Sequence, residues 1–264
     1  MFDSTRATAR LLRGTAALWV LLALLPSYAA AQTSASDSTF LDADWVGTQF
    51  TAGNGGSSTG AQALAGGNPG PFRNVTDVLN AAPQGSETIV LSTSIYTPFT
   101  YNPSVTGAIA SLNYAEDAAC TAGCFGAGQS TGPALLQGGN LYILSSSSVI
   151  TGPGALWLPH ALSGLTAVDF GLVNVTPTTI FDNTQHPNFS ATGAPIQFGF
   201  FRANGTSVNG PGYTLAAGID NWQVTLTAVT AQTPPSAIPA VGMAGLAFLA
   251  GLLLLATAFL RRAR

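Results

Sequence analysis

An uncharged apolar run near the C-terminus limits what this chain can fold into more than any other feature. Residues 238–260 carry no charged side chain, and an arginine cluster follows them directly, at Arg261, Arg262 and Arg264. About twenty apolar residues in a helix span roughly 30 Å, the thickness of the hydrocarbon layer of a bilayer. A core helix of a soluble protein is usually amphipathic and shorter. The run therefore predicts a single C-terminal transmembrane helix.

The N-terminus carries a second membrane-related signal. The leader is basic, with arginines at Arg6, Arg10 and Arg13. A short apolar run over residues 15–25 is followed by small residues at Ala29 and Ala31. A basic leader, a short apolar core and an Ala-x-Ala exit are typical of a secretory signal peptide. We expect residues 1–31 to direct export through the Sec machinery and to be removed by signal peptidase before Gln32.

The two terminal signals agree on the topology of the chain. Short basic flanks remain on the cytoplasmic side of a membrane, so the body is expected outside the cytoplasm, in the periplasm or at the cell surface. Residues 32–229 are long enough to form one domain with a full core. Residues 230–237 are rich in proline and predict a linker, and residues 238–264 form the C-terminal signal.

The C-terminal segment contains a spaced motif ahead of its apolar run, formed by Ile238, Pro239, Gly245 and Leu246. With the arginine cluster, this pattern resembles the sorting signals of Gram-negative surface proteins that exosortase-type transpeptidases process. It is most similar to the IPTL-CTERM variant, although Ala240 stands where that family has Thr; the PEP-CTERM variant is less similar because Pro-Glu-Pro does not occur. The resemblance implies that the helix is cut and the body is transferred to a surface carrier. An unprocessed single-span membrane protein is the alternative.

Basic side chains are scarce in the body. Arg73 and Arg202 are its only arginines, and the chain has no lysine, whereas all of the chain's acidic residues except Asp3 lie in the body. A surface of this kind cannot neutralise a row of phosphates, so nucleic acid is excluded as a partner.

Short alternating or β-branched runs between turn residues predict an all-β domain. The expected strands cover residues 39–51, 88–95, 105–114, 155–158, 196–200, 213–215 and 222–229, with a hairpin over 135–144. We expect residues 53–71 to form a loop, and only residues 74–81 show a weak helical period. Many short strands in one domain predict a two-sheet, jelly-roll-like sandwich.

Parts of the body resemble known secreted modules. Residues 218–226 read Gly-Ile-Asp-Asn-Trp-Gln-Val-Thr-Leu, and this segment is similar to the final strand of extracellular jelly-roll and laminin-G-like domains. Residues 66–70 and 189–192 resemble segments of secreted bacterial proteins with such sorting tails. The resemblance implies a sandwich fold and an extracytoplasmic location, and it implies no activity.

The two cysteines, Cys120 and Cys124, are close in sequence. In an exported chain this spacing favours a disulfide-closed loop. A metal site is the alternative, but two thiols without a nearby histidine fall short of the usual zinc ligand set.

Two further groups of residues are candidate ligand-binding sites. Asp42, Asp44 and Asp220 would come together if the first and last strands are neighbours, and carboxylate oxygens suit a structural calcium ion; no other cofactor is expected. Tyr142 and Trp157 are candidates for stacking on a sugar. Core packing is the alternative for both rings, because half of the residues in a strand face inward.

These observations favour a non-enzymatic surface or extracellular-matrix protein of a Gram-negative-type bacterium that binds polysaccharide. The alternative is a secreted hydrolase of glycans or esters. A glycosidase needs two facing carboxyl groups, and adjacent Glu116 and Asp117 would point to opposite faces of a strand. Residues 128–132 match the Gly-x-Ser-x-Gly spelling of a nucleophile elbow, and Asp169 and His186 follow Ser130 in the order of a hydrolase triad. Residues 56–60 match the spelling equally well.

Overall fold

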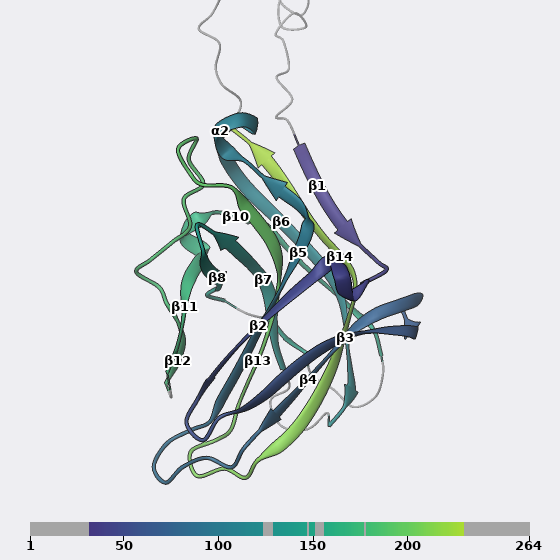
Figure 1. Ribbon diagram of the computed structural model, residues 1–264, viewed down its shortest axis with the longest axis vertical. Helices are drawn as coiled ribbons and strands as arrows, with labels where there is room; N and C mark the ends of the chain where they lie inside the picture. Colours follow the sequence, from purple (N-terminus) through teal and green to yellow (C-terminus); the bar gives the residue numbers. More distant parts are fainter. Residues whose placement is uncertain (1–31, 124–128, 147, 151–155, 177, 230–264) are drawn as a thin grey trace, which may run out of the picture. The chain divides into compact units, whose positions relative to one another are not determined.

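A computed structural model describes residues 32–229 apart from 124–128, 147, 151–155 and 177 (Figure 1). The predicted signal peptide, linker and C-terminal sorting signal, including its transmembrane helix, lie outside the described residues and stay predictions. Among the residues that are described, no helix has the length and apolar character needed to cross a membrane.

Sheet A has the strand order β10-β6-β14-β4-β3, and β1 also pairs with β14. Its strands are β1 (Gln32–Asp37), β3 (Gly56–Gly67), β4 (Gly70–Leu79), β6 (Ile109–Ala122), β10 (Leu158–Leu165) and β14 (Tyr213–Ala228). All of the strand pairs are antiparallel. The first and last strands of the domain therefore lie side by side, as expected from the sequence (Figure 1).

Sheet B has the strand order β12-β11-β8-β7-β13-β5-β2, and β9 also pairs with β7. Its strands are β2 (Trp45–Ala52), β5 (Ile89–Tyr101), β7 (Gln129–Gln137), β8 (Asn140–Leu144), β9 (Ser148–Ile150), β11 (Phe170–Thr176), β12 (Thr179–Asp182) and β13 (Ile196–Gly205). The short helices are η1 (Asp42–Asp44), α2 (Pro103–Thr106) and η2 (Ala167–Asp169). The predicted all-β, two-sheet sandwich is confirmed.

Several sequence predictions about local structure are wrong. The strand predicted over 105–114 begins only at Ile109, after α2, and residues 156–157 of the strand predicted over 155–158 precede β10. Residues 53–71, expected as a loop, contain the whole of β3, and residues 74–81, with a weak helical period, lie mostly in β4. β3 is built from Gly, Ser, Thr, Ala, Gln and Leu, so it lacks the β-branched and aromatic signal of a typical strand. Pairing with β4 along most of its length supplies the stabilisation that its own composition does not. The hairpin at Gly138 and Gly139 is confirmed, and both glycines have positive φ.

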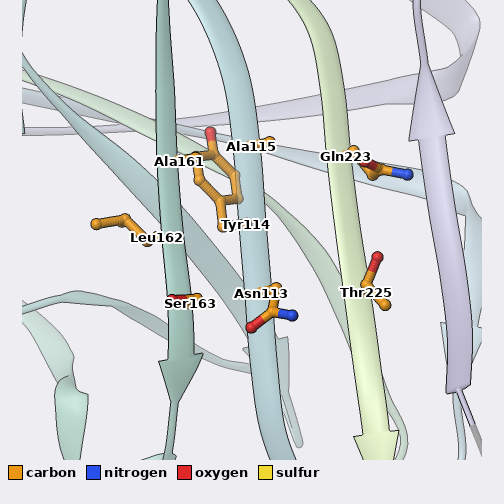
Figure 2. Close-up of a pocket in the computed structure, with 8 residues that line it drawn as sticks. All are labelled: Asn113, Tyr114, Ala115, Ala161, Leu162, Ser163, Gln223 and Thr225. Atoms are coloured by element: carbon orange, nitrogen blue, oxygen red, sulfur yellow. The ribbon is translucent and has the colours of Figure 1, made fainter.

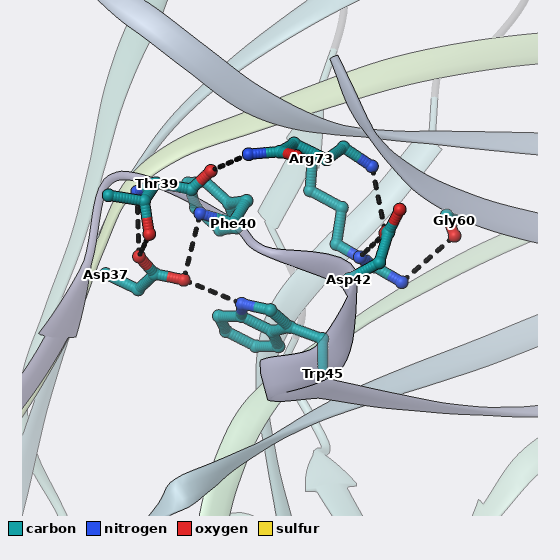
Figure 3. A network of polar contacts seen from close by, with 8 residues as sticks. Asp37, Thr39, Phe40, Asp42, Trp45, Gly60 and Arg73 are labelled. Atoms are coloured by element: carbon teal, nitrogen blue, oxygen red, sulfur yellow. Dashed lines mark hydrogen bonds and ion pairs between the residues drawn. The ribbon is translucent and has the colours of Figure 1, made fainter. Parts of the chain in front are cut away.

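An aromatic cluster joins the two sheets at the centre of the core. The ring of Trp45 on β2 lies 5.1 Å from that of Trp222 on β14 and 5.3 Å from that of Phe200 on β13. Aromatic pairs of this kind contribute about 0.5–1.5 kcal/mol each beyond the area that they bury. The buried carboxylate of Asp37 accepts a 2.8 Å hydrogen bond from Nε1 of Trp45, which fixes the end of β1 against the cluster (Figure 3).

Buried polar side chains also cross between the sheets. Glu116 on β6 lies 3.3 Å from the guanidinium of Arg202 on β13, and it accepts hydrogen bonds from Tyr114 at 2.5 Å and from Thr131 at 2.6 Å. Both members of the ion pair have fully buried side chains. Removing one partner of such a pair leaves a buried charge uncompensated, so this contact fixes how β6 and β13 align.

A second polar bridge involves Asp77 on β4. Its carboxylate accepts hydrogen bonds from Asn204 at 2.6 Å and from Gln129 at 2.9 Å, both on strands of sheet B. Burial raises the pKa of Asp77, although the hydrogen bonds and the charge of Arg202 oppose this shift. The ionised form of Asp77 is therefore disfavoured by folding.

Candidate functional site

The outer face of sheet A carries a shallow hollow of about 240 Å³, which we call the outer-face groove (Figure 2). It lies over β10, β6 and β14. Side chains on this face alternate with core residues: Asn113 is exposed, whereas its neighbours Leu112 and Tyr114 are buried. The lining residues are Asn113, Tyr114, Ala115, Ala161, Leu162, Ser163, Gln223 and Thr225.

The strand register explains why a hollow forms here. Gln223 on β14 is opposite Ala115 on β6, which is opposite Ala161 on β10. The short side chains of Ala115 and Ala161 form the floor of the hollow, and the longer side chain of Gln223 forms one edge (Figure 2). In the next row, Thr225 is opposite Asn113. Because residues in register point to the same face, the groove presents amides and a hydroxyl above a floor of methyl groups.

Several polar groups of the groove are not used in the fold. Oδ1 of Asn113 accepts a 2.8 Å hydrogen bond from the backbone N–H of Gly164, which holds its amide in place. Within the described part of the chain, the side chains of Ser163, Gln223 and Thr225 make no hydrogen bond. The outer-face groove therefore offers uncharged donors and acceptors to a ligand, and none of its lining residues carries a charge.

Trp157 lies on the same face of sheet A, farther along β14. Its ring packs edge-on against Phe72 with 5.3 Å between ring centres, and its Nε1 donates a 3.0 Å hydrogen bond to the carbonyl of Gly66. A Cβ atom at Gly218 would lie only 2.6 Å from the ring of Trp157, so the absent side chain of Gly218 makes room for it. The ring is half-buried, which leaves part of it open to solvent.

Two carboxylates lie between Trp157 and the groove. Asp117 on β6 is directly opposite Asp220 on β14. Asp220 is fully buried and accepts hydrogen bonds from the backbone N–H groups of Asn68 at 2.5 Å and Asn221 at 2.7 Å. Burial raises the pKa of Asp220, with the nearby charge of Asp117 adding to the shift. The side-chain amides of Asn68 and Asn221 both donate to Asp117, so this pair is tied to the β3–β4 hairpin.

The structure corrects the predicted calcium set. Asp42 lies in η1 and pairs with Arg73 at 2.8 Å, and Asp44 is in the same short helix, whereas Asp220 is held by Asn68. In the described parts of residues 32–229, no three acidic, histidine or cysteine side chains come together as a metal site would require. The first and last strands are neighbours, the condition on which that prediction rested. However, Asp42 and Asp44 lie in η1 after β1, where Asp42 accepts a hydrogen bond from the N–H of Gln62 on β3.

The other predicted ligand and disulfide residues are placed as follows. Tyr142 is only 8% exposed and belongs to the core, so it has no free ring face for a sugar, which corrects that prediction. Trp157 remains a candidate because it is partly open on the face that carries the groove. Cys120 is buried and is not a free thiol. Its predicted partner, Cys124, lies outside the described residues, so their disulfide stays a prediction.

The residues considered for hydrolysis are not brought together. Glu116 points into the core and Asp117 points outward, as expected for adjacent strand residues. Ser130 lies within β7 and not at a strand-to-helix turn. The carboxylate of Asp169 accepts hydrogen bonds from Thr166, and Nδ1 of His186 contacts the carbonyl of Phe170 at 2.7 Å. None of these contacts joins a nucleophile to a base.

The sequence analysis missed the groove residues Asn113, Ser163, Gln223 and Thr225. Each is a small or uncharged polar residue, a type that is common in loops. The available signal was their alternation with buried apolar residues, as in 223–228, where Gln, Thr and Thr alternate with Val, Leu and Ala. Such a pattern predicts a strand with one polar face, but it does not show which other strands extend that face.

No protein-family model matches the chain, and no curated protein matches it. Solved structures of similar fold include the CBM22-1 xylan-binding domain from Paenibacillus barcinonensis Xyn10C, with a TM-score of 0.37, 9% identity, and coverage of 77% of this chain and 99% of that one. A protein of unknown function from Shewanella oneidensis MR-1 has a TM-score of 0.34 and 13% identity, with coverage of 86% and 95%. At these TM-scores the likenesses carry no argument about function.

Proposed function

We propose that the domain of residues 32–229 binds a neutral polysaccharide along the outer face of sheet A. The observation that carries this proposal is the outer-face groove, where the uncharged side chains of Ser163, Gln223 and Thr225 have no hydrogen-bond partner among the described residues. Sugar hydroxyls both donate and accept hydrogen bonds, and groups such as Gln223 and Thr225 can do the same. We propose binding and not catalysis, because no lining residue of the groove carries a carboxyl, imidazole or thiol group, and the hydroxyl of Tyr114 already donates to Glu116.

The charge distribution supports a neutral ligand. The body contains two arginines and no lysine, and both arginines are buried, with Arg73 4% exposed and Arg202 fully enclosed. The surface therefore has no lysine or arginine side chain that could pair with a sulfate or uronate. Asp117, next to the groove on β6, would repel such groups.

The length of the outer face of sheet A supports an extended polysaccharide as the ligand. From Gly218, beneath Trp157, to Thr225 in the groove, β14 covers about 23 Å at roughly 3.3 Å per residue. A ring at one end and a polar hollow at the other provide separate contacts for different units of a polymer. Aromatic rings commonly supply such a contact because they are apolar and flat.

Binding can be tested with the full chain on an array of neutral and acidic glycans. We expect binding to neutral chains, and we expect Gln223→Ala and Thr225→Ala each to weaken it by about tenfold, the effect of one lost hydrogen bond. Thr214→Ala is the matched control, because Thr214 is exposed on the same strand outside the groove. Equal binding by Thr225→Ala and Thr214→Ala, or binding only to acidic glycans, would contradict the proposal.

We further propose that the domain works outside the inner membrane, attached to the envelope. The basic leader ending at Ala31 and the apolar run before Arg261 support this location. A surface position would place the outer-face groove where it can meet extracellular polymers. The IPTL-CTERM-like motif at Ile238 and Pro239 supports processing by an exosortase-type enzyme.

A further inference from the structure

A second hollow of about 190 Å³ lies where strands β2 and β5 of sheet B face β3 and β4 of sheet A. We call it the edge pocket. It is separate from the outer-face groove, and the two share no lining residue. Its lining residues are Gly47, Thr48, Gln49, Ser58, Gly60, Arg73, Val75, Ser92, Thr93 and Ser94.

The pocket forms because small residues occupy positions between the two sheets where larger side chains usually fill the core of a sandwich. Gly47 is opposite Ser94 on sheet B, and Gly60 is opposite Val75 on sheet A. A Cβ atom at Gly47 would meet nothing closer than 3.9 Å. Protein interiors are close-packed, so an open polar space between two sheets requires an explanation.

Arg73 gives the pocket its chemistry. Its side chain is nearly fully buried, and two of its three nitrogens are occupied: Nη1 pairs with Asp42 at 2.8 Å and Nη2 donates to the carbonyl of Gly60 at 3.0 Å (Figure 3). Nε has no hydrogen-bond partner. Nε is itself enclosed, and a Cβ atom at Gly60 would lie only 3.1 Å from it, so a residue without a side chain fits best here. A buried donor without a partner is costly, and a ligand oxygen that reaches Nε after a small shift of the Arg73 side chain would relieve that cost.

The remaining walls restrict the ligand. Gln49 links β2 to β3, since its Nε2 donates to Gly56 and its Oε1 accepts from the N–H of Ser58. This bridge closes one side of the pocket. Val75 provides an apolar surface, and Ser92 and Ser94 provide hydroxyls. The volume corresponds to about six water molecules at ~30 Å³ each, which suits one sugar ring and not a chain.

The charge balance decides between a neutral and an acidic ligand. Asp42 already neutralises the guanidinium of Arg73, and no lining residue other than Arg73 is charged. A buried carboxylate would therefore be an uncompensated charge, which is strongly disfavoured. A hydroxyl or ring oxygen needs only the free N–H. We propose that the edge pocket binds a single neutral sugar ring, with one of its oxygens accepting a hydrogen bond from Nε of Arg73.

The proposal can be tested by NMR on the full chain labelled with 15N-arginine. The probes are the methyl glycosides of glucose, galactose, mannose and xylose, with glucuronate as the charged comparison. The Nε–H signal of Arg73, identified by its loss in Arg73→Gln, should shift with at least one neutral glycoside. A signal that no neutral glycoside moves, or that moves only with glucuronate, overturns the proposal.

Two variants test whether the glycoside that shifts the Arg73 signal binds in the edge pocket. Gly47→Val fills the space, and Gly60→Ala places a methyl group beside Nε; each should weaken sugar binding by about tenfold or more. Val46→Thr is the matched control, since Val46 is 56% exposed and points to the opposite face of β2. Unchanged affinity in both glycine variants contradicts the proposal. Thr225→Ala should leave this binding unchanged, so failure of the outer-face groove and failure of the edge pocket are distinguishable.

Discussion

Asp37 determines how the chain turns from β1 towards β2. Its carboxylate accepts hydrogen bonds from Nε1 of Trp45, from the N–H and hydroxyl of Thr39, and from the N–H of Phe40. Phe40 has a φ of 51°, a left-handed conformation that is unfavourable for a bulky residue. The carboxylate compensates for that strain. Burial by itself raises the pKa of Asp37, but the hydrogen bonds from Trp45, Thr39 and Phe40 together hold it below the usual value.

We predict that Asp37→Asn lowers the free energy of unfolding by about 1–3 kcal/mol at neutral pH, because hydrogen bonds to a charged acceptor are lost. The folded pKa of Asp37 is depressed, so its stabilisation is present above the unfolded pKa near 3.8 and is lost as the pH falls through the folded value. Urea titrations at several pH values should show a smaller loss of stability on acidification in the variant than in the parent, because other carboxyl groups such as Asp182 also have a lowered pKa.

Asp44→Asn is the control for this measurement. Asp44 is in the same turn, and its carboxylate makes no side-chain hydrogen bond among the described residues. A surface change of this kind usually shifts stability by no more than about 0.5 kcal/mol. An Asp44→Asn effect as large as that of Asp37→Asn would show that the turn responds to charge in general and not to the Asp37 contacts.

At the scale of elements, β14 carries most of the candidate site. The sequence predicted two strands here, over 213–215 and 222–229, but the structure has one strand of 16 residues. Residues 215–220 are buried on both faces, so they lack the alternation that reveals a strand. A bulge between Asp220 and Gln223 then changes which residues face outward. Hydrophobic pattern alone could predict the sandwich, but not this change of register.

The same limit applies to the aromatic candidates. Tyr142 and Trp157 were equivalent in the sequence, since each lies in or beside a short apolar run. The structure buries Tyr142 in β8 and places Trp157 across the outer face of sheet A. What separates them is Gly218, more than sixty residues away in the chain, whose missing side chain accommodates the tryptophan ring. A contact at that separation is set by strand order, which local sequence does not encode.

We predict that Gly218→Ala displaces the ring of Trp157. The added Cβ would lie 2.6 Å from Trp157 and 2.8 Å from Phe72, so one ring must move, at a cost of about 1–3 kcal/mol. Chemical denaturation should show the loss, and neutral-glycan binding should weaken with it. Gly205→Ala is the control, because a Cβ at Gly205 meets nothing closer than 3.7 Å and Gly205 lines neither the outer-face groove nor the edge pocket. Equal stability of the two variants would contradict the packing described for Trp157.

At the scale of the whole molecule, the domain combines a strongly joined interior with a surface low in charge. Buried bridges from Glu116 to Arg202 and from Asp77 to Asn204 connect the two sheets. The acidic residues outnumber the basic ones in the body, and its arginines are internal. A domain of this kind has little attraction for anionic envelope surfaces, so the proposed attachment to the envelope would need another part of the chain. The proposed C-terminal signal would supply it.

We predict that the exported protein begins at Gln32 and that an exosortase-type host removes the C-terminal arginines. Mass spectrometry of the protein recovered from the envelope measures both ends. Retention of Arg264 would indicate an unprocessed single-span protein. Recovery from the cytosol with the leader intact would contradict the proposed location altogether.

The position of β14 has a consequence for the order in which the domain is completed. β14 is the last described strand to leave the ribosome, yet it pairs with β1, β4 and β6 and forms the centre of sheet A. β4 and β6 cannot be joined into one sheet until β14, which lies between them, has been synthesised up to residue 228. Sec-type passage requires an unfolded chain, and under the proposed export the late arrival of the central strand would keep this domain unfolded until nearly all of it had crossed.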